Sequence, residues 1–308
     1  MSTAELLRPA PYAPSVPLPA PYPGDTTIPL SLRPAHPNSS VADITAEIRA
    51  LSDSGRIRDL LDRHGAIYFQ GLGLPNADEF SRFAHAFGWT PHEDIGNPVR
   101  RTVLAPNVAT ANEGPNTMPV YPHNEFGLSP HYPAYNIKYQ LFHANGPRDQ
   151  TGSPGTTVLQ AYGQHVLDDD DTETARRKIE AEISRLPGTT WKWENQSDVN
   201  QLGDLRVFRV LPAIRNHPRT GQPAFFNNAV SRFLNALSSD TLLPPHLNSE
   251  GEFQPPVFYG DGSLIPREYL DSAVEYIYET RALVSWRDGD VLLLDNHAVQ
   301  HAREPWVG

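Results

Sequence analysis

The sequence predicts a mainly β domain with flanking helices, arranged as a double-stranded β-helix, or jelly roll. From about residue 100 onward, short β-rich runs bounded by turn residues outnumber the helical segments. No internal repeat is visible, and many strands with few helices suggest a double-sheet barrel with helices packed outside. At 308 residues the chain is long enough to bury a full core.

The first 40 residues are expected to form a proline-rich extended arm ahead of a jelly-roll domain at 41–308. Seven prolines lie between Pro9 and Pro23. Proline fixes φ and removes a backbone N–H, so we expect neither a helix nor an inner strand in this arm.

Apolar spacing then predicts the elements in order. Helical spacing covers 42–63, a β-rich run closed by glycines covers 65–71, and a second helical segment at 76–88 has Asn76 as its cap. An acidic run at 168–171 suits the start of a helix at 168–186. A further helix is expected at 266–280, and strands are expected at 135–143, 156–162, 205–211, 223–228 and 280–295.

Composition excludes several classes of function. A net charge of −11 argues against nucleic acid or an anionic membrane as the main partner, since both need clustered Lys and Arg. The absence of cysteine excludes disulfides and thiolate chemistry, so a metal site must use His, Asp and Glu. No secretory signal and no membrane-length apolar run are found, which predicts a soluble, cytoplasmic protein.

Two His-x-acid pairs are candidate metal ligands, His92-x-Asp94 and His123-x-Glu125. Chance gives about one such pair for 12 histidines and 36 acidic residues, so context must decide. His123 and Glu125 precede a β-rich block, and residues i and i+2 of an extended segment share a face. They can therefore converge on one metal ion. His92 lies in a proline-flanked loop and is interpreted as an exposed histidine.

A third ligand has to come from a distant strand. After the Asp288-Gly289 turn and an apolar run, the chain reaches His301, with His297 as a lesser candidate by pattern alone. The alternative for His301 is a surface histidine. His123, Glu125 and His301 match the two-histidine, one-carboxylate triad of non-haem Fe(II) enzymes, which leaves positions open for a cosubstrate and O₂.

Four blocks together resemble the taurine dioxygenase / clavaminate synthase-like superfamily of Fe(II)- and 2-oxoglutarate-dependent oxygenases, over roughly residues 60–308. They are the early strand at 66–71, the His123-Asn124-Glu125 motif, a turn like Gly-Gly-x-Thr at Pro154-Gly155-Thr156-Thr157, and Asp295-Asn296-x4-His301-Ala302-Arg303, which is similar to the family's distal block. The resemblance implies that His123, Glu125 and His301 hold Fe(II) and that Thr157 contacts 2-oxoglutarate. Arg303 is a second candidate for contacting this cosubstrate.

One departure concerns an arginine. In the family, an arginine about 9–14 residues past the distal histidine grips the far carboxylate of 2-oxoglutarate. This sequence extends only to Gly308, so we expect the domain to lack its last C-terminal strand. Three explanations stay open: a truncated chain, a substitute cation such as Arg303, or a protein that does not use 2-oxoglutarate. Arg303 can equally pair with an acid such as Asp295 or Glu304.

The resemblance implies a dioxygenase that couples decarboxylation of 2-oxoglutarate to hydroxylation, desaturation or cyclisation of a small polar, amino-acid-like metabolite. Substrate and O₂ are then the expected partners. Two alternatives remain: a metal-dependent jelly-roll enzyme that does not use 2-oxoglutarate, and a lapsed homologue that acts as a binding protein. The segment Phe225 to Asn228 is interpreted either as a pocket wall or as an ordinary strand.

Overall fold

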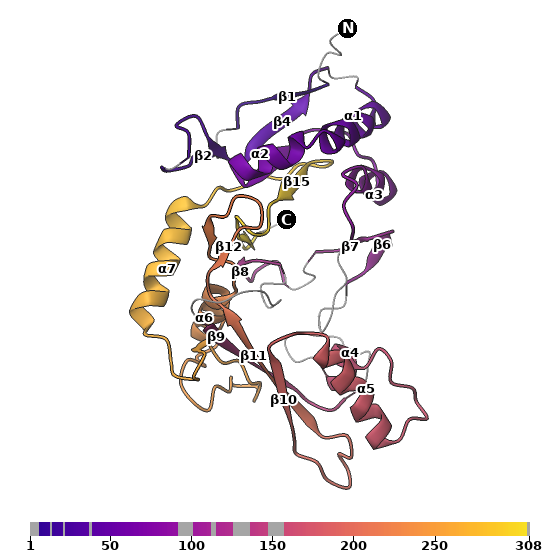
Figure 1. The fold of residues 1–308 in the computed structure, drawn as a ribbon, viewed down its shortest axis with the longest axis vertical. Helices are drawn as coiled ribbons and strands as arrows, with labels where there is room; N and C mark the ends of the chain where they lie inside the picture. The colour runs from indigo at the N-terminus through magenta and orange to yellow at the C-terminus, as the bar shows by residue number, and fades with distance from the viewer. Residues whose placement is uncertain are drawn as a thin grey trace.

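The computed structural model describes residues 6–12, 14–20, 22–36, 39–91, 101–111, 115–125, 136–146 and 157–306. Two four-stranded sheets form its centre, and helices flank them (Figure 1). The predicted mainly β architecture with flanking helices is confirmed, while the closed jelly roll stays a prediction. Within the described residues, every helix is too short or too polar to span a bilayer.

The first sheet has the order β1-β4-β5-β15. β4 and β5 run parallel and the other neighbours antiparallel. Its strands are β1 (Leu7–Pro9), β4 (Leu30–Pro34), β5 (Ala66–Phe69) and β15 (Val291–Leu294).

The second sheet has the order β10-β11-β9-β14 and is antiparallel throughout. Its strands are β9 (Asn136–His143), β10 (Thr189–Glu194), β11 (Asp204–Pro212) and β14 (Phe258–Tyr259). Among the described residues there are also four two-stranded pairs: β16 (His301–Arg303) with β8 (Val120–His123), β12 (Arg215–Asn216) with β13 (Pro223–Ala224), β2 (Val16–Pro17) with β3 (Thr27–Ile28), and β6 (Val103–Ala105) with β7 (Val108–Ala109).

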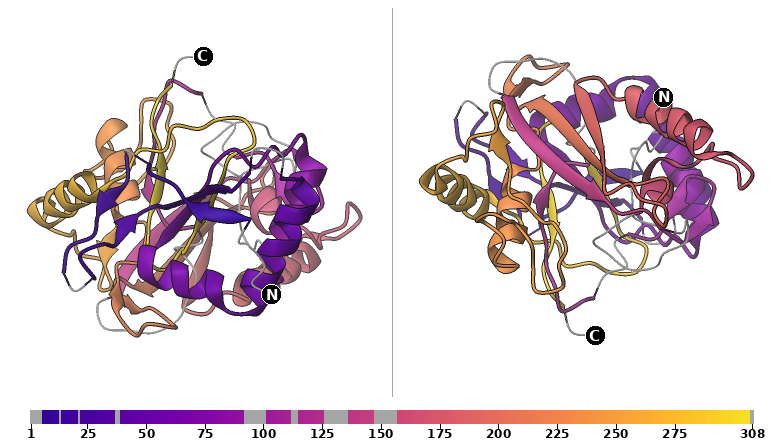
Figure 2. Two further views of the ribbon diagram at one scale, coloured as in Figure 1. Left: turned by 90° about the horizontal axis from the view of Figure 1, so that it is seen from above. Right: turned by 90° about the horizontal axis from the view of Figure 1, so that it is seen from below.

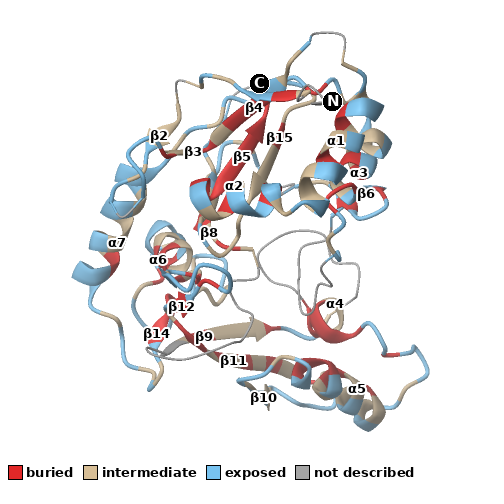
Figure 3. Ribbon diagram, turned by 45° about the horizontal axis from the view of Figure 1, so that its top comes forward, coloured by how far each residue is buried: buried red, intermediate tan, exposed pale blue. Residues whose placement is uncertain are grey.

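Three helices pack on the first sheet: α1 (Val41–Asp53), α2 (Arg56–His64) and α3 (Ala77–His85). Their apolar faces meet buried side chains of β4, β5 and β15. In Figure 3, β4, β5 and α1 carry red, buried segments. Asn76 caps α3 as predicted, because its side chain accepts a hydrogen bond from the Glu79 N–H. The helical spacing predicted over 42–63 is confirmed, and it forms two helices, α1 and α2. They separate at Gly55, whose φ of +81° belongs to the left-handed region that favours glycine.

The helices α4 (Val158–Tyr162) and α5 (Thr172–Ser184) pack on the second sheet. The strand expected at 156–162 is wrong, because the Thr157 hydroxyl accepts a hydrogen bond from the Gln160 N–H and starts α4. Its β-rich composition fits the buried side of a helix equally well. In all views α4 and α5 lie toward one side of the molecule, and α7 (Arg267–Thr280) lies along the other (Figures 1 and 2).

The strand expected at 280–295 forms only from Val291 onward. The predicted Asp288-Gly289 turn is present, with Gly289 at φ +80°, but no strand precedes it. A further helix, α6 (Ala229–Ser238), lies beside β8 and starts where the predicted strand at 223–228 was expected to end.

The N-terminal segment departs from one expectation. β4 lies between β1 and β5 and is therefore an inner strand. This is possible because residues 30–33 contain no proline, so their N–H groups can pair. The division of the chain at residue 40 stays a prediction.

Candidate metal centre

The strand pair β8 and β16 brings two distant histidines together. His301 is the direct partner of His123 across the antiparallel ladder, and their ring centroids are 4.3 Å apart. Directly opposed residues in such a ladder have Cβ atoms about 5 Å apart, close enough to share a ligand. The sequence predicted both histidines, and the register of this pair places them side by side.

Glu125 completes the group. Its Oε1 lies 3.4 Å from His301 Nε2, and one donor atom from each of His123, Glu125 and His301 falls within 4.8 Å of the others. The side chains of Glu125 and His301 remain 40% and 30% exposed. A small ligand can therefore reach the group from solvent.

The donor atoms fit a metal ion. His123 Nδ1 lies 2.7 Å from the Tyr121 carbonyl oxygen, so Nδ1 carries the proton and Nε2 is free to act as a ligand. Burial, and then the nearby His301, lower the pKa of His123, which favours the neutral imidazole that metals bind. The hydrogen bond from His301 lowers the pKa of Glu125 and favours its carboxylate form. Two neutral imidazoles and one carboxylate suit Fe(II).

Asn124, between the candidate ligands His123 and Glu125, is a structural clamp that the sequence analysis did not assign. Asn124 is 1% exposed. Its Nδ2 donates to the carbonyl oxygens of Asn296 and Val299 at 2.7 and 3.0 Å, and its Oδ1 accepts from the Asn227 N–H at 3.1 Å. These bonds tie the His-x-Glu segment to the loop that leads into His301.

A second clamp acts on Glu125 itself. The Glu125 N–H donates to Asn296 Oδ1 at 2.8 Å, and Asn296 Nδ2 donates back to the Glu125 carbonyl at 2.7 Å. The last two residues of the segment Phe225 to Asn228 have a supporting role that neither earlier interpretation included. Asn228 Oδ1 accepts from the Asn124 N–H, and the Asn227 N–H donates to Asn124 Oδ1. The role of these asparagines could not be predicted from the sequence, because each bonds the backbone of a segment far away in the chain.

The loop before His301 rests on Gly65. The Gly65 carbonyl accepts a hydrogen bond from the Asp295 N–H at 2.8 Å, and a Cβ at Gly65 would lie 2.7 Å from Val299 Cγ1. Gly65 also has φ +68° as the C-cap of α2. The helical layer on the first sheet therefore sets the position of the loop that leads into His301.

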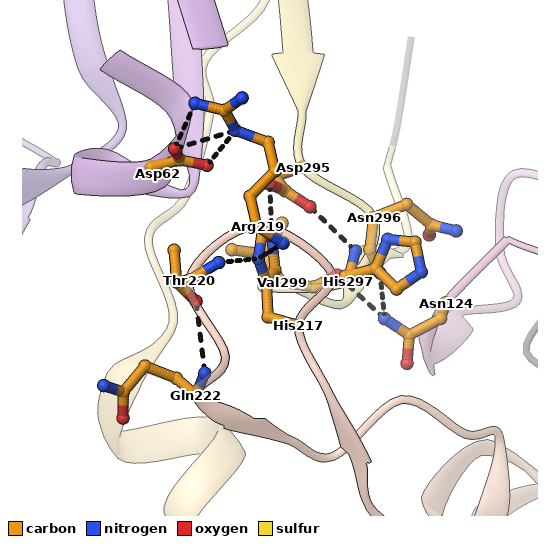
Figure 4. A network of polar contacts seen from close by, with 10 residues as sticks. All are labelled: Asp62, Asn124, His217, Arg219, Thr220, Gln222, Asp295, Asn296, His297 and Val299. Atoms are coloured by element: carbon orange, nitrogen blue, oxygen red, sulfur yellow. Dashed lines mark hydrogen bonds and ion pairs between the residues drawn. The ribbon is translucent and has the colours of Figure 1, made fainter. Parts of the chain in front are cut away.

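A second cluster of His and acid lies beside this loop (Figure 4). Donor atoms of Asp62, His217 and Asp295 also fall within 4.8 Å of one another. Here the groups bond among themselves: His217 Nε2 lies 2.9 Å from Asp295 Oδ2, and His217 Nδ1 accepts from the Arg219 and Thr220 N–H groups. Arg219 in turn pairs with Asp62 at 2.8 Å.

The remaining predicted residues take other positions. His297 stacks on Phe226, with ring centroids 4.9 Å apart, and is not part of the ligand group. Arg303 donates from Nη2 to the carbonyls of Pro115 and Met118 at 2.9 and 3.0 Å, which ties down the segment before β8. Thr157 is buried as the N-cap of α4. His92, Asp94 and the turn at 154–156 lie outside the described residues.

Arg101, which the sequence analysis did not name, also lies near the cluster of His123, Glu125 and His301. Arg101 Nη2 lies 3.8 Å from Glu125 Oε1, and both side chains are partly exposed. A surface ion pair of this length adds little stability.

Comparison with known proteins decides the family. The model of the taurine catabolism dioxygenase TauD, TfdA family matches residues 31–308. The chain belongs to this family. Enzymes of the TauD/TfdA family use Fe(II) and 2-oxoglutarate and act on a small molecule with O₂.

Curated relatives are distant. A clavaminate synthase-like protein of Arabidopsis thaliana is 24% identical over 80% of this chain and 79% of its own length. Dapdiamide synthesis protein DdaC of Enterobacter agglomerans is 23% identical over 82% of each chain. The crystal structure of the PvcB protein from Pseudomonas aeruginosa matches with a TM-score of 0.42 and 19% identity, over 96% of this chain and 87% of that one.

Proposed function

We propose that this TauD/TfdA family member is an Fe(II)- and 2-oxoglutarate-dependent dioxygenase with a jelly-roll core. The observation that carries the proposal is the meeting of His123, Glu125 and His301 across the β8–β16 pair, with donor atoms within 4.8 Å. His123 Nε2, the Glu125 carboxylate and His301 Nε2 would hold the metal. The bound metal with 2-oxoglutarate and O₂ supplies the oxidising power for attack on a C–H bond.

The chain's own residues would bind and orient. Asn124 and Asn296 hold the two ligand segments against each other, so the donor set is already assembled before a metal binds. Thr157 and Arg303 are proposed to contribute to 2-oxoglutarate binding. Thr157 lies at the buried start of α4, and Arg303 lies two residues past His301, where its contacts are with backbone carbonyls.

The substrate is proposed to be a small polar, amino-acid-like metabolite, and hydroxylation is the default outcome. Support comes from the names of two relatives, one clavaminate synthase-like and one a dapdiamide synthesis protein. The exposed side of Glu125 and His301 leaves room for a small molecule beside the metal.

The test is anaerobic titration of the protein with Fe(II) and 2-oxoglutarate while following the weak visible charge-transfer band of the chelate. We expect a band in the natural chain and no band in His301→Ala. His297→Ala is the matched control and should keep the band, because His297 stacks on Phe226 away from the donor atoms.

Two results would contradict the proposal. Metal binding at His123, Glu125 and His301 without any band would favour a metal enzyme that does not use 2-oxoglutarate. Absence of metal binding would favour a binding protein that has lost catalysis.

A further inference from the structure

The segment 281–287 leads from α7 to β15, and no partner strand pairs with it among the described residues (Figure 1). Backbone groups without a ladder need other partners, and here a side chain from the N-terminal arm supplies them. The Tyr12 hydroxyl accepts a hydrogen bond from the Ser285 N–H at 2.8 Å and donates to the Leu283 carbonyl oxygen at 3.1 Å. Tyr12 therefore takes the place of a neighbouring strand at this point.

Tyr12 is packed as well as hydrogen-bonded. Its ring centroid lies 4.9 Å from that of Tyr68 on β5, and Tyr68 is 1% exposed. The Tyr68 ring also meets Trp286 edge-on at 6.1 Å, and its hydroxyl lies 3.1 Å from the Ser285 carbonyl oxygen. Both backbone groups of Ser285 are thus bonded by tyrosines, one from the arm and one from the first sheet.

The arm is fixed to the first sheet on both sides of Tyr12. Before it, β1 pairs with β4, and the Ala10 N–H donates to the Ser31 carbonyl oxygen at 3.0 Å. After it, the Ser15 hydroxyl donates to the Pro29 carbonyl oxygen at 2.9 Å. The sheet therefore holds Tyr12 in place against the segment 281–287.

The same segment is also bonded to the strand of the distal histidine. Arg281, its first residue, forms an ion pair with Glu304 at 2.5 Å, and its guanidinium lies over the Tyr278 ring at 4.5 Å. Glu304 directly follows β16, which contains His301. A continuous set of contacts therefore runs from Tyr12, through this segment, to the strand pair of the candidate metal ligands.

The strand pair β8–β16 depends on contacts of this kind. Among the described residues it is a ladder of two short strands, and a ladder of two strands is only marginally stable by itself. Its register places His301 opposite His123. Contacts that hold β16 from outside the pair therefore help to keep the two histidines together.

We propose that Tyr12 is a positioning residue for the metal centre and that the N-terminal arm acts as a strap. Tyr12 holds the segment 281–287, and Arg281 of this segment holds β16 through Glu304. The proposal rests on the proposed function, because it takes the cluster that contains His301 as a metal centre. Since the last link is an exposed ion pair, the strap has a modest effect on that centre.

The test compares Tyr12→Phe with Tyr22→Phe as the matched control. The tetrapeptide Pro-Ala-Pro-Tyr occurs at 9–12 and again at 19–22, so both variants lose a hydroxyl from the same local sequence. Tyr22 is 40% exposed, and no hydrogen bond of its hydroxyl is found among the described residues. Phenylalanine at position 12 keeps the ring contact with Tyr68 and removes the two hydrogen bonds to the segment.

Dissociation constants for Fe(II) are measured anaerobically, without 2-oxoglutarate. Tyr12→Phe should weaken Fe(II) binding by about 2- to 5-fold, which is the range that an exposed ion pair can transmit, and Tyr22→Phe should leave the constant unchanged. An unchanged constant in Tyr12→Phe would overturn the proposal. Tyr12 would then be structural only, even if the variant unfolds at a lower urea concentration.

Arg281→Gln tests the route from the arm to β16. Removing a positive charge would by direct electrostatics strengthen the binding of a cation, whereas losing the ion pair with Glu304 weakens it. We expect weaker Fe(II) binding in Arg281→Gln, and no further loss when Tyr12→Phe is added. Stronger binding in Arg281→Gln, or independent effects of the two substitutions, would overturn the strap.

Coupling between two sites is reciprocal, so Fe(II) should act back on the segment. Trypsin cleaves after Arg281 and Arg287, and Fe(II) should slow this cleavage in the natural chain by more than in Tyr12→Phe. Cleavage in the natural chain that does not respond to bound Fe(II) would overturn the proposal.

Failure of the proposed function gives a different result. If the natural chain binds no Fe(II), the metal assignment fails, and the strap is tested on the metal-free chain by hydrogen exchange of the peptide that contains β16. Faster exchange there in Tyr12→Phe than in Tyr22→Phe supports the strap, because β16 has then lost a support. Equal exchange in the two variants overturns it.

Discussion

Two clusters of histidine and carboxylate lie on either side of the loop from Asp295 to His301, and they differ in what their donor atoms already bind. In the cluster of His123, Glu125 and His301, His123 Nδ1 bonds a carbonyl, and among the described residues no hydrogen bond of its Nε2 is found. In Asp62, His217 and Asp295, both nitrogens of His217 are engaged and Arg219 occupies Asp62 (Figure 4).

The comparison teaches that proximity of ligand-type residues is not sufficient for a metal site. Both groups meet the same 4.8 Å limit. A metal ion must displace protons and hydrogen bonds, and at His217 it would strand two backbone N–H groups and one guanidinium. At the first cluster it would displace the 3.4 Å contact between His301 Nε2 and Glu125 and the 3.8 Å surface pair of Glu125 with Arg101. We therefore interpret the first cluster as a metal centre and the second as a structural brace for the loop.

The largest effect is expected from removing a ligand. His123→Ala should weaken metal binding by more than about 100-fold, because two remaining ligands cannot hold the ion against water. The natural chain should bind one divalent ion, and His217→Ala should still bind one. Equilibrium dialysis with metal analysis checks both. A second ion that is lost in His217→Ala would show that the two clusters are alike after all.

We expect the structural role of the cluster of Asp62, His217 and Asp295 to be measurable as folding stability. His217→Ala leaves Asp295 and the N–H groups of Arg219 and Thr220 without a partner, so we expect a loss of about 2–4 kcal/mol in the free energy of unfolding. Urea unfolding measures it. The exposed His165→Ala is the control and should cost less than about 0.5 kcal/mol. A similar small cost for His217→Ala would contradict the brace.

A smaller effect is expected from two glycine substitutions, which distinguish a shift of the loop before His301 from backbone strain alone. Gly65→Ala and Gly71→Ala both force a side chain onto a positive φ, +68° and +62°, which costs about 1–2 kcal/mol. Only at Gly65 does the new Cβ meet Val299 Cγ1. We therefore expect Gly65→Ala to cost more in stability and also to weaken metal binding, whereas Gly71→Ala should leave metal affinity unchanged. Equal metal affinities in the two variants would show that the position of the loop from Asp295 to His301 does not affect the metal centre.

The smallest effect concerns His297, between the clusters. Burial lowers its pKa below the usual 6.5, despite the opposing charge of Asp295. Above about pH 6.5 the ring is neutral in folded and unfolded chains, so it does not affect stability. As the pH falls below that value the unfolded chain takes up the proton first, and stability is lost by at most about 1.4 kcal/mol per pH unit.

His297→Phe should keep the stacking on Phe226 and remove this acid-sensitive loss. Unfolding free energies of the natural chain and the variant, measured from pH 7.5 to 5.5, give the difference. A difference that does not change with pH would mean that His297 has the same pKa in both states.

Much of the fold followed from local patterns. Asn76, Asp171 and the glycine-bounded run at 66–69 form the cap, helix start and strand that their residue types favour. Thr157 was misassigned because its β-rich neighbours also suit a buried helix, and only its hydroxyl bond to Gln160 decides. The segment 281–287 carries strand-like residues, but no partner strand among the described residues pairs with it. β structure depends on partners that are distant in sequence.

For the site, the sequence by itself determined which residues could be ligands, since residue chemistry and the His-x-Glu spacing are local properties. It named His301 as the third ligand through the distal block, but it gave no sign that His217 would be occupied, because the hydrogen bonds of His217 depend on tertiary packing. The register of β8 against β16 and the asparagine clamps are products of tertiary packing. Burial and pairing are set by long-range contacts, and only the folded chain contains them.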